Sequence, residues 1–94
     1  MDAMKERRVI LFSGRVQGVG FRMTAVHLAG DLALGGIVRN LDSGHVELEV
    51  EGEASHIDTL VARLREHFGG YIRNVSQHSS SLTGTFGQGI RVSH

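Results

Sequence analysis

The sequence predicts an α+β fold with one antiparallel sheet and two helices packed on one of its faces. The clearest evidence is a strand in which Val46, Leu48 and Val50 alternate with polar residues, so that one face is buried and the other is wet. Two segments, 21–32 and 55–68, instead carry apolar residues at helical spacing. Together with shorter apolar segments they predict the order strand, helix, strand, strand, helix, strand.

The first half of the chain contributes two strands and one helix. An apolar run at Val9–Phe12 predicts the first strand. The first helix is predicted from apolar residues at Phe21, Ala25, Leu28, Ala29 and Leu32. The two glycines in 34–36 suit a left-handed cap that closes this helix, so the second strand is expected at 37–41.

The second half begins with a hairpin, because the turn at 42–44 joins the second strand to the alternating third strand. The second helix is expected to begin at Ser55, with Asp58 as an acidic capping partner, and to end at Gly69-Gly70. Its buried stripe is predicted to consist of Ile57, Leu60, Val61, Leu64 and Phe68.

The last part of the chain is less regular. Within 71–77 only Ile72 and Val75 are expected to point inward, residues 78–84 form a polar loop, and a last short strand is predicted at 86–92. The resulting βαββαβ order is that of a ferredoxin-like α/β sandwich. Because the chain has 94 residues and no repeat or linker, residues 1–94 are expected to form a single domain.

Composition restricts the partners. Ten basic and ten acidic residues cancel, so no global field favours nucleic acid or an anionic membrane. The absence of cysteine excludes disulfides, thiolate metal sites and a cysteine nucleophile. The first eight residues mix charges, and the apolar run after them is too short for a signal peptide or a membrane span. A cytoplasmic monomer is therefore expected.

The run Gly14–Arg22 lies between the first strand and the first helix and predicts an anion site. Its glycines allow backbone conformations in which successive amides point at one centre, and the helix start adds positive potential. Arg22 supplies a planar fork that matches two phosphate oxygens. The residues expected to bind a phosphoryl group are Val16, Gln17, Gly18, Val19, Gly20, Phe21 and Arg22.

The string Val-Gln-Gly-Val-Gly-Phe-Arg at 16–22, with the blocks at 36–40 and 42–47, resembles the acylphosphatase family over most of the chain. The resemblance implies the same α/β sandwich. It also implies that Arg22 is the phosphate-binding catalytic arginine and that Asn40 orients the attacking water. From the residues alone, Asn40 also fits a strand end entering a turn. Arg39 is expected to be structural and Arg15 to be a surface charge.

An Arg, several amides and an Asn suit a narrow class of reaction. An acyl phosphate expels a carboxylate whose conjugate acid has a pKa of about 4, so no acid has to assist its departure. The predicted activity is therefore hydrolysis of a small acyl phosphate to carboxylate and phosphate, without metal or cofactor, and with alkyl monoesters as poor substrates. Six scattered histidines fit no metal-ligand set, and Glu47, Glu49 and Glu51 are expected to form the wet face of a strand.

The chain departs from the family pattern at two apolar positions and near its end. Met23 and Ile37 stand where many members carry aromatic residues, and both are expected to change the pocket walls. The segment 88–92 replaces an aromatic residue, a spacer and Ile-Arg-Tyr. With the glycines at 84, 87 and 89, it predicts a looser final segment.

Two alternatives remain open from the sequence. The chain could be a non-catalytic module that holds carbamoyl phosphate or phosphate, as domains of this kind in larger maturation enzymes are thought to do. It could instead bind RNA through its sheet, but such sheets carry exposed aromatic residues, whereas this strand offers Glu47, Glu49 and Glu51.

Overall fold

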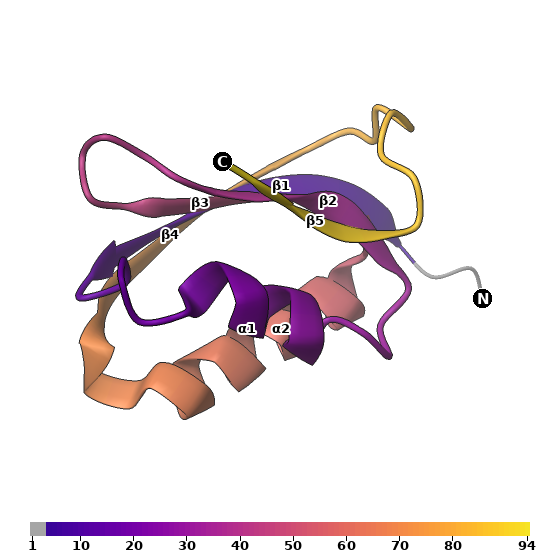
Figure 1. The fold of residues 1–94 in the computed structure, drawn as a ribbon. Helices are drawn as coiled ribbons and strands as arrows, with labels where there is room; N and C mark the ends of the chain where they lie inside the picture. Colours follow the sequence, from indigo (N-terminus) through magenta and orange to yellow (C-terminus); the bar gives the residue numbers. More distant parts are fainter. Residues whose placement is uncertain (1–3) are drawn as a thin grey trace.

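A computed structural model of the protein describes residues 4–94 and places two helices on one face of a five-stranded sheet (Figure 1). The predicted α+β fold class is confirmed. Residues 1–3, part of the charged N-terminal segment and of the predicted 1–94 domain, lie outside the described residues. The elements are β1 (Lys5–Gly14), α1 (Phe21–Leu28), β2 (Leu34–Asn40), β3 (Val46–Glu53), α2 (Ala54–Phe68), a 3₁₀ turn at Gly69–Tyr71, β4 (Ile72–Ser80) and β5 (Gly89–Ser93).

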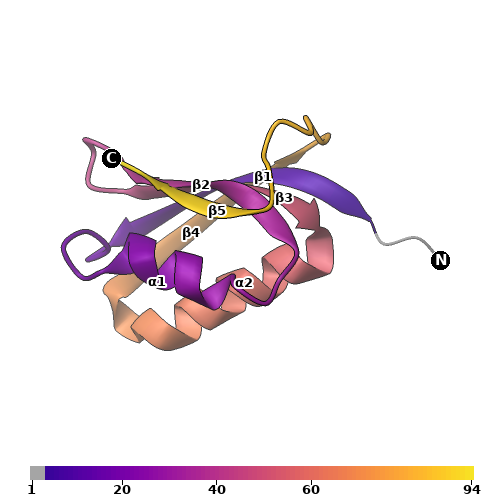
Figure 2. The same ribbon diagram turned by 45° about the vertical axis from the view of Figure 1, so that its right-hand side comes forward.

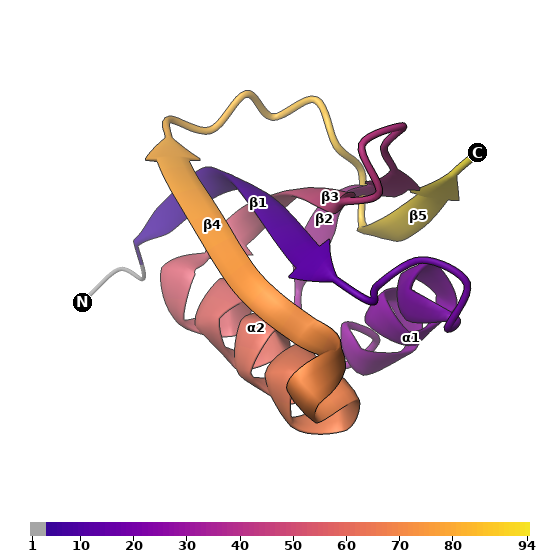
Figure 3. The same ribbon diagram turned by 90° about the vertical axis from the view of Figure 1, so that its left-hand side faces the viewer.

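The sheet has the strand order β4-β1-β3-β2-β5. Its first four strands pair antiparallel, and β2 and β3 form the predicted hairpin. The strand β5 pairs parallel to β2, so the sheet is mixed and not wholly antiparallel as expected. The reason is visible in Figure 3, where the segment after β4 crosses the molecule to the opposite edge before β5 begins. The βαββαβ order is thus complete at β4, and β5 is an added edge strand.

The strand β4 was not predicted as a strand, because the last strand of the βαββαβ order was expected at 86–92. It includes residues 78–80, which were expected to be loop, because the backbone of β1 pairs with it from Gly14 to Arg7. Most side chains of β4 are exposed, and only Ile72 and Val75 pack against the core, as predicted. An edge strand with one partner and few inward residues carries a weak hydrophobic signal.

The ends of both helices differ from the predicted ends. The helix α1 stops at Leu28, and Gly35 and Gly36 lie inside β2, where a Cβ would overlap the backbone of Gly87 or Glu49. These glycines therefore permit close strand packing and do not cap a helix. The helix α2 begins directly after β3, and its N-cap residue Glu53 makes no side-chain cap hydrogen bond.

Neither predicted capping residue of α2 acts as a cap. The position of Ser55 is inside the first turn, where its carbonyl oxygen accepts a hydrogen bond from the Thr59 hydroxyl at 2.9 Å. The Asp58 carboxylate instead pairs with Arg8 across the core edge at 2.6 Å. The start of the helix is instead held by the residue before β1, because the Ala54 amide donates to the Met4 carbonyl oxygen at 2.9 Å.

The core lies between the sheet and the helices (Figure 2), and it contains the whole predicted stripe of α2. Three aromatic rings connect its layers. The rings of Phe12 and Phe21 have centroids 4.9 Å apart, and those of Phe21 and Phe68 are 4.7 Å apart. Phe21 is the first residue of α1, so the core anchors the start of that helix. No helix within residues 4–94 is long and apolar enough to cross a membrane.

Candidate active site

The loop between β1 and α1 is fixed at both ends and turns outward between them. Val16 and Phe21 are only 1% and 2% exposed, so the core holds both ends of the loop. Between them Gly18 and Gly20 both have φ of 77°, in the left-handed region that other residues seldom adopt. Gly20 is also the N-cap of α1. The predicted role of these two glycines in shaping the loop agrees with their conformations.

The backbone amides of this loop are available to a ligand. The Arg15 amide donates to the Tyr71 carbonyl oxygen at 2.8 Å, and the Thr24 amide donates to the Gly20 carbonyl oxygen at 3.0 Å. Within residues 4–94, no amide from 16 to 23 donates to another backbone carbonyl. Free amides at the start of a helix are donors for an anion, and the helix dipole adds to the attraction.

The side chain of Gln17 has a role that the sequence did not reveal. Its Nε2 donates to the carbonyl oxygens of Leu41 and His45 at 2.8 and 3.0 Å. Leu41 directly follows Asn40, so Gln17 ties the glycine loop to the end of β2. No sequence signal identifies this contact, because its partners are backbone atoms of a distant turn.

A small cavity joins the two predicted catalytic residues. It has a volume of about 110 Å³, a few times the roughly 30 Å³ that one water occupies in the liquid, and so suits a phosphoryl group better than a nucleotide. Its lining consists of Val16, Gly18, Gly20, Phe21, Arg22, Met23 and Asn40. Arg22 comes from α1 and Asn40 from the end of β2, and Figure 2 shows the start of α1 and the end of β2 at the same end of the molecule. Gln17 and Val19 do not line it; Val19 packs against the core.

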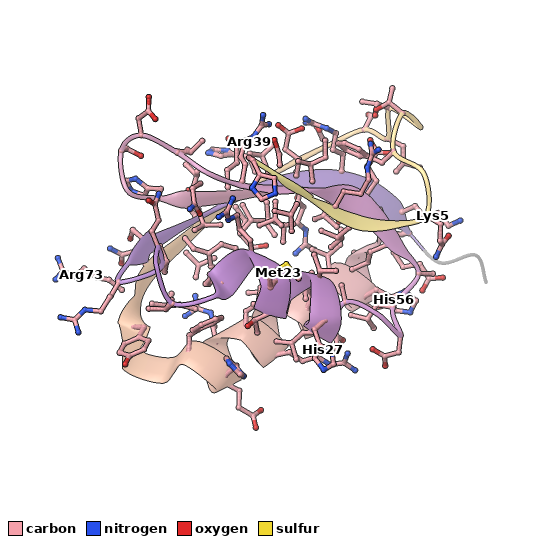
Figure 4. All side chains as sticks on the ribbon, viewed as in Figure 1. Lys5, Met23, His27, Arg39, His56 and Arg73 are labelled. Atoms are coloured by element: carbon pink, nitrogen blue, oxygen red, sulfur yellow. The ribbon has the colours of Figure 1, made fainter. Side chains whose placement is uncertain are left out.

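One of the two apolar departures reaches this cavity. Met23 lines the cavity and is 67% exposed, and Figure 4 shows it on α1. Ile37 is not among the lining residues, since it alternates with Val38 along β2 and lies on the other face of the strand. The expectation that both positions shape the pocket is therefore wrong for Ile37.

The guanidinium of Arg22 is held by the end of β5. Its Nη1 donates to the Ser93 carbonyl oxygen at 3.2 Å and lies 3.4 Å from Nδ1 of His94. Among residues 4–94 neither Nε nor Nη2 of Arg22 has a hydrogen-bond acceptor. These two nitrogens form one edge of the planar fork, and such an edge binds two oxygens of a phosphate.

The neighbouring arginines have structural contacts. Arg39 lies on the face of the sheet away from the helices (Figure 4), where it pairs with Glu47 at 2.8 Å and also with Glu49. The guanidinium carbon of Arg15 is 6.0 Å from the centre of the Tyr71 ring, and Arg15 does not line the cavity. Both residues agree with the predicted structural and surface roles.

The family comparison agrees with this geometry: a family model described as Acylphosphatase matches residues 8–88. The chain belongs to the acylphosphatase family. A protein named acylphosphatase from Chlorobaculum tepidum is 46% identical over 63 residues, which are 66% of this chain and 68% of that protein. A second, from Paenarthrobacter aurescens, is 43% identical over 75 residues, covering 79% of this chain and 80% of the relative.

A solved acylphosphatase also has the same fold. The crystal structure of acylphosphatase from Bacillus subtilis superposes with a TM-score of 0.83 at 28% identity, and the match covers 97% of this chain and 100% of that one. The reaction of the acylphosphatase family, hydrolysis of acyl phosphates, is accordingly the activity of this chain. The alternative of a non-catalytic phosphate-binding module is not favoured.

One acidic residue differs from the expectation, drawn from the alternating pattern of β3, that Glu47, Glu49 and Glu51 form a wet strand face. Glu51 is only 7% exposed, because the segment between β4 and β5 covers it. Its carboxylate accepts hydrogen bonds from the Thr83 amide at 2.9 Å, the Gly84 amide at 3.0 Å and the Thr83 hydroxyl. Burial by itself would raise the pKa of Glu51, but these hydrogen bonds outweigh burial and lower the pKa.

Within the described residues, the histidines do not gather into a metal site. Within residues 4–94, no group of three His, Cys, Asp or Glu side chains is placed to hold a metal ion. Figure 4 shows His27 on α1 and His56 on α2. His94 approaches the small cavity through its contact with Arg22.

Proposed function

We propose that this cavity is where the chain hydrolyses acyl phosphates, with Arg22 binding the phosphoryl group and Asn40 orienting the water. One observation carries the proposal. Arg22 and Asn40 come from different elements, yet they line the same small cavity beside the free amides of the glycine loop. Each group alone has a structural explanation, whereas their convergence supplies what this reaction requires.

The loop amides and the Nε–Nη2 edge of Arg22 bind the equatorial oxygens of the phosphoryl group. Charge on these oxygens is spread through the transition state, so fixed donors around them stabilise it without having to reorient. In other enzymes, removing one such donor lowers kcat by about 10²- to 10³-fold. Arg22 combines a full charge with two donors and is expected to contribute at the upper end.

The side chain of Asn40 places the nucleophile. Its carbonyl oxygen accepts a hydrogen from the attacking water, and its amide group can donate elsewhere. The water oxygen bonds to phosphorus as the bridging P–O bond breaks, and the carboxylate leaves with the electron pair. The water proton passes to solvent, so the products are a carboxylate and inorganic phosphate. A carboxylate leaves without protonation, which is why no general acid is required.

The test compares benzoyl phosphate with 4-nitrophenyl phosphate as the monoester control, with a chelator present throughout. The wild type is expected to hydrolyse only the acyl phosphate, and Arg22→Ala and Asn40→Ala are each expected to lose at least about 100-fold in kcat. Arg15→Ala is the matched control, because that arginine belongs to the same loop but does not line the cavity. Retention of activity in either site variant, or no hydrolysis of benzoyl phosphate by the wild type in the presence of chelator, would contradict the proposal.

We further propose that residues 1–94 act as a monomeric, cytoplasmic domain without a nucleic-acid partner. Equal numbers of acidic and basic residues support this, as do the outer-face arginines Arg7 and Arg39, which are already paired with Glu47 and Glu49. A light-scattering mass of two chains would refute the monomer. Binding of single-stranded RNA at low salt would refute the absence of a nucleic-acid partner.

A further inference from the structure

The end of β5 supplies both acceptors for one nitrogen of the catalytic arginine. Nη1 of Arg22 is 3.2 Å from the Ser93 carbonyl oxygen and 3.4 Å from Nδ1 of His94. A primary guanidinium nitrogen carries two hydrogens, so these two acceptors use both of them. The opposite edge, Nε and Nη2, then remains directed at the cavity that Arg22 lines.

The two acceptors differ in their response to pH. The Ser93 acceptor is a backbone carbonyl, which accepts at every pH. The His94 acceptor is an imidazole nitrogen, which accepts only while it carries no proton. A protonated imidazole would present an N–H and a positive charge to the guanidinium, and the contact would become repulsive. Imidazole is also the side chain that ordinarily gains its proton between pH 5 and 8.

The charged side chain in contact with the His94 ring is itself a cation. The charged group facing it from α1 is Arg22. From β2, Arg39 stands in register with Ser93, but its guanidinium is paired with Glu47 and Glu49. Arg91 is the charged residue within β5 itself. A proton on the His94 ring would therefore place a second positive charge beside the Arg22 guanidinium.

We propose that His94 is a positioning residue for Arg22. Its neutral imidazole holds the guanidinium in the orientation that binds the phosphoryl group, and its protonation releases that hold and weakens binding. This inference rests on the proposed function only in that Arg22 binds phosphate. It makes the site sensitive to pH through a residue that touches neither the substrate nor the water.

The test uses His94→Gln, which keeps an acceptor that does not titrate. The kcat/KM for benzoyl phosphate and the Kd for inorganic phosphate are measured from pH 5 to 8 in both proteins. Ratios of wild type to variant at each pH cancel the ionisation of the phosphate itself. The matched control is His78→Gln, an exposed histidine on β4, at the edge of the sheet away from β5.

Near pH 8 the wild type and His94→Gln are expected to agree within about twofold. Towards pH 5 the wild type is expected to fall about threefold to tenfold below the variant, in kcat/KM and in phosphate affinity alike, as expected for one lost hydrogen bond. Wild type and His78→Gln should give a constant ratio. The proposal would be overturned if the ratio of wild type to His94→Gln did not change with pH, or if the wild type became better than the variant at low pH. If benzoyl phosphate is not hydrolysed, the proposed function fails, while the phosphate Kd still decides the role of His94.

Discussion

At the scale of single residues, the shape of the site depends on the two left-handed glycines of the loop. A Cβ at Gly18 or Gly20 would meet no atom within 4 Å, so space does not select glycine at either position. The constraint is the φ of 77°, which costs a residue with a side chain about 1 kcal/mol or more. Any substitution therefore acts through the backbone conformation of the loop.

Gly20→Ala tests this reading. Alanine is expected to lower the free energy of unfolding by about 1 kcal/mol and to raise the Kd for inorganic phosphate, because relaxation of φ turns the loop amides away. Urea unfolding and phosphate titration measure the two effects. Gly87→Ala is the control, because Gly87 also has open space but no positive φ. Equal behaviour of the two variants would show that the left-handed conformation is unimportant.

At the scale of residues, the sequence indicates a site where its groups lie close together along the chain, and the binding role of these residues stays a prediction. Gly18, Gly20 and Arg22 follow one another along the chain, so their pattern predicts a cradle. Asn40 was identified through family resemblance, since an Asn at a strand end has an ordinary explanation. The side-chain contacts of Gln17 and His94 could not be predicted, because their partners become neighbours only in the folded chain.

At the scale of elements, what the sequence predicts well are segments with a buried face. The strand β3 and the helix α2 have such faces, and their predicted buried residues are all in the core. The edge strand β4 has few buried residues and was not predicted as a strand, and the parallel pairing of β5 was not predicted either. The glycines at 35 and 36 were misplaced for a related reason, since close strand packing and a helix cap both favour glycine.

The segment that links the two edges is attached through Glu51. The lowered pKa of Glu51 means that the folded state favours its carboxylate form. The charged carboxylate therefore stabilises the fold above the ordinary pKa of 4.5, and this stabilisation is lost as pH falls below that value. Glu51→Gln is expected to lower the free energy of unfolding by about 2 kcal/mol at pH 7 and by much less at pH 3.5. Urea unfolding at both values measures this. Exposed Glu66→Gln should change little, and a pH-independent effect at Glu51 would exclude the charged carboxylate as its source.

At the scale of the whole molecule, three elements bring the site together at one end of the sheet. The start of α1 supplies Arg22, the end of β2 supplies Asn40, and the end of β5 holds the arginine. The formal net charge is zero, so attraction of an anion depends on this local arrangement and not on the overall field. The fold brings these groups to one cavity, and the proposed chemistry depends on that convergence.

The central claim is that Arg22 binds the phosphoryl group and Asn40 orients the water. The most direct measurement is the Kd for inorganic phosphate beside kcat for benzoyl phosphate, in the wild type, Arg22→Ala and Asn40→Ala. The account predicts that Arg22→Ala loses both phosphate affinity and kcat. Asn40→Ala should keep wild-type phosphate affinity within about threefold while kcat falls at least about 100-fold. Loss of phosphate affinity in Asn40→Ala equal to that in Arg22→Ala would contradict this division of roles.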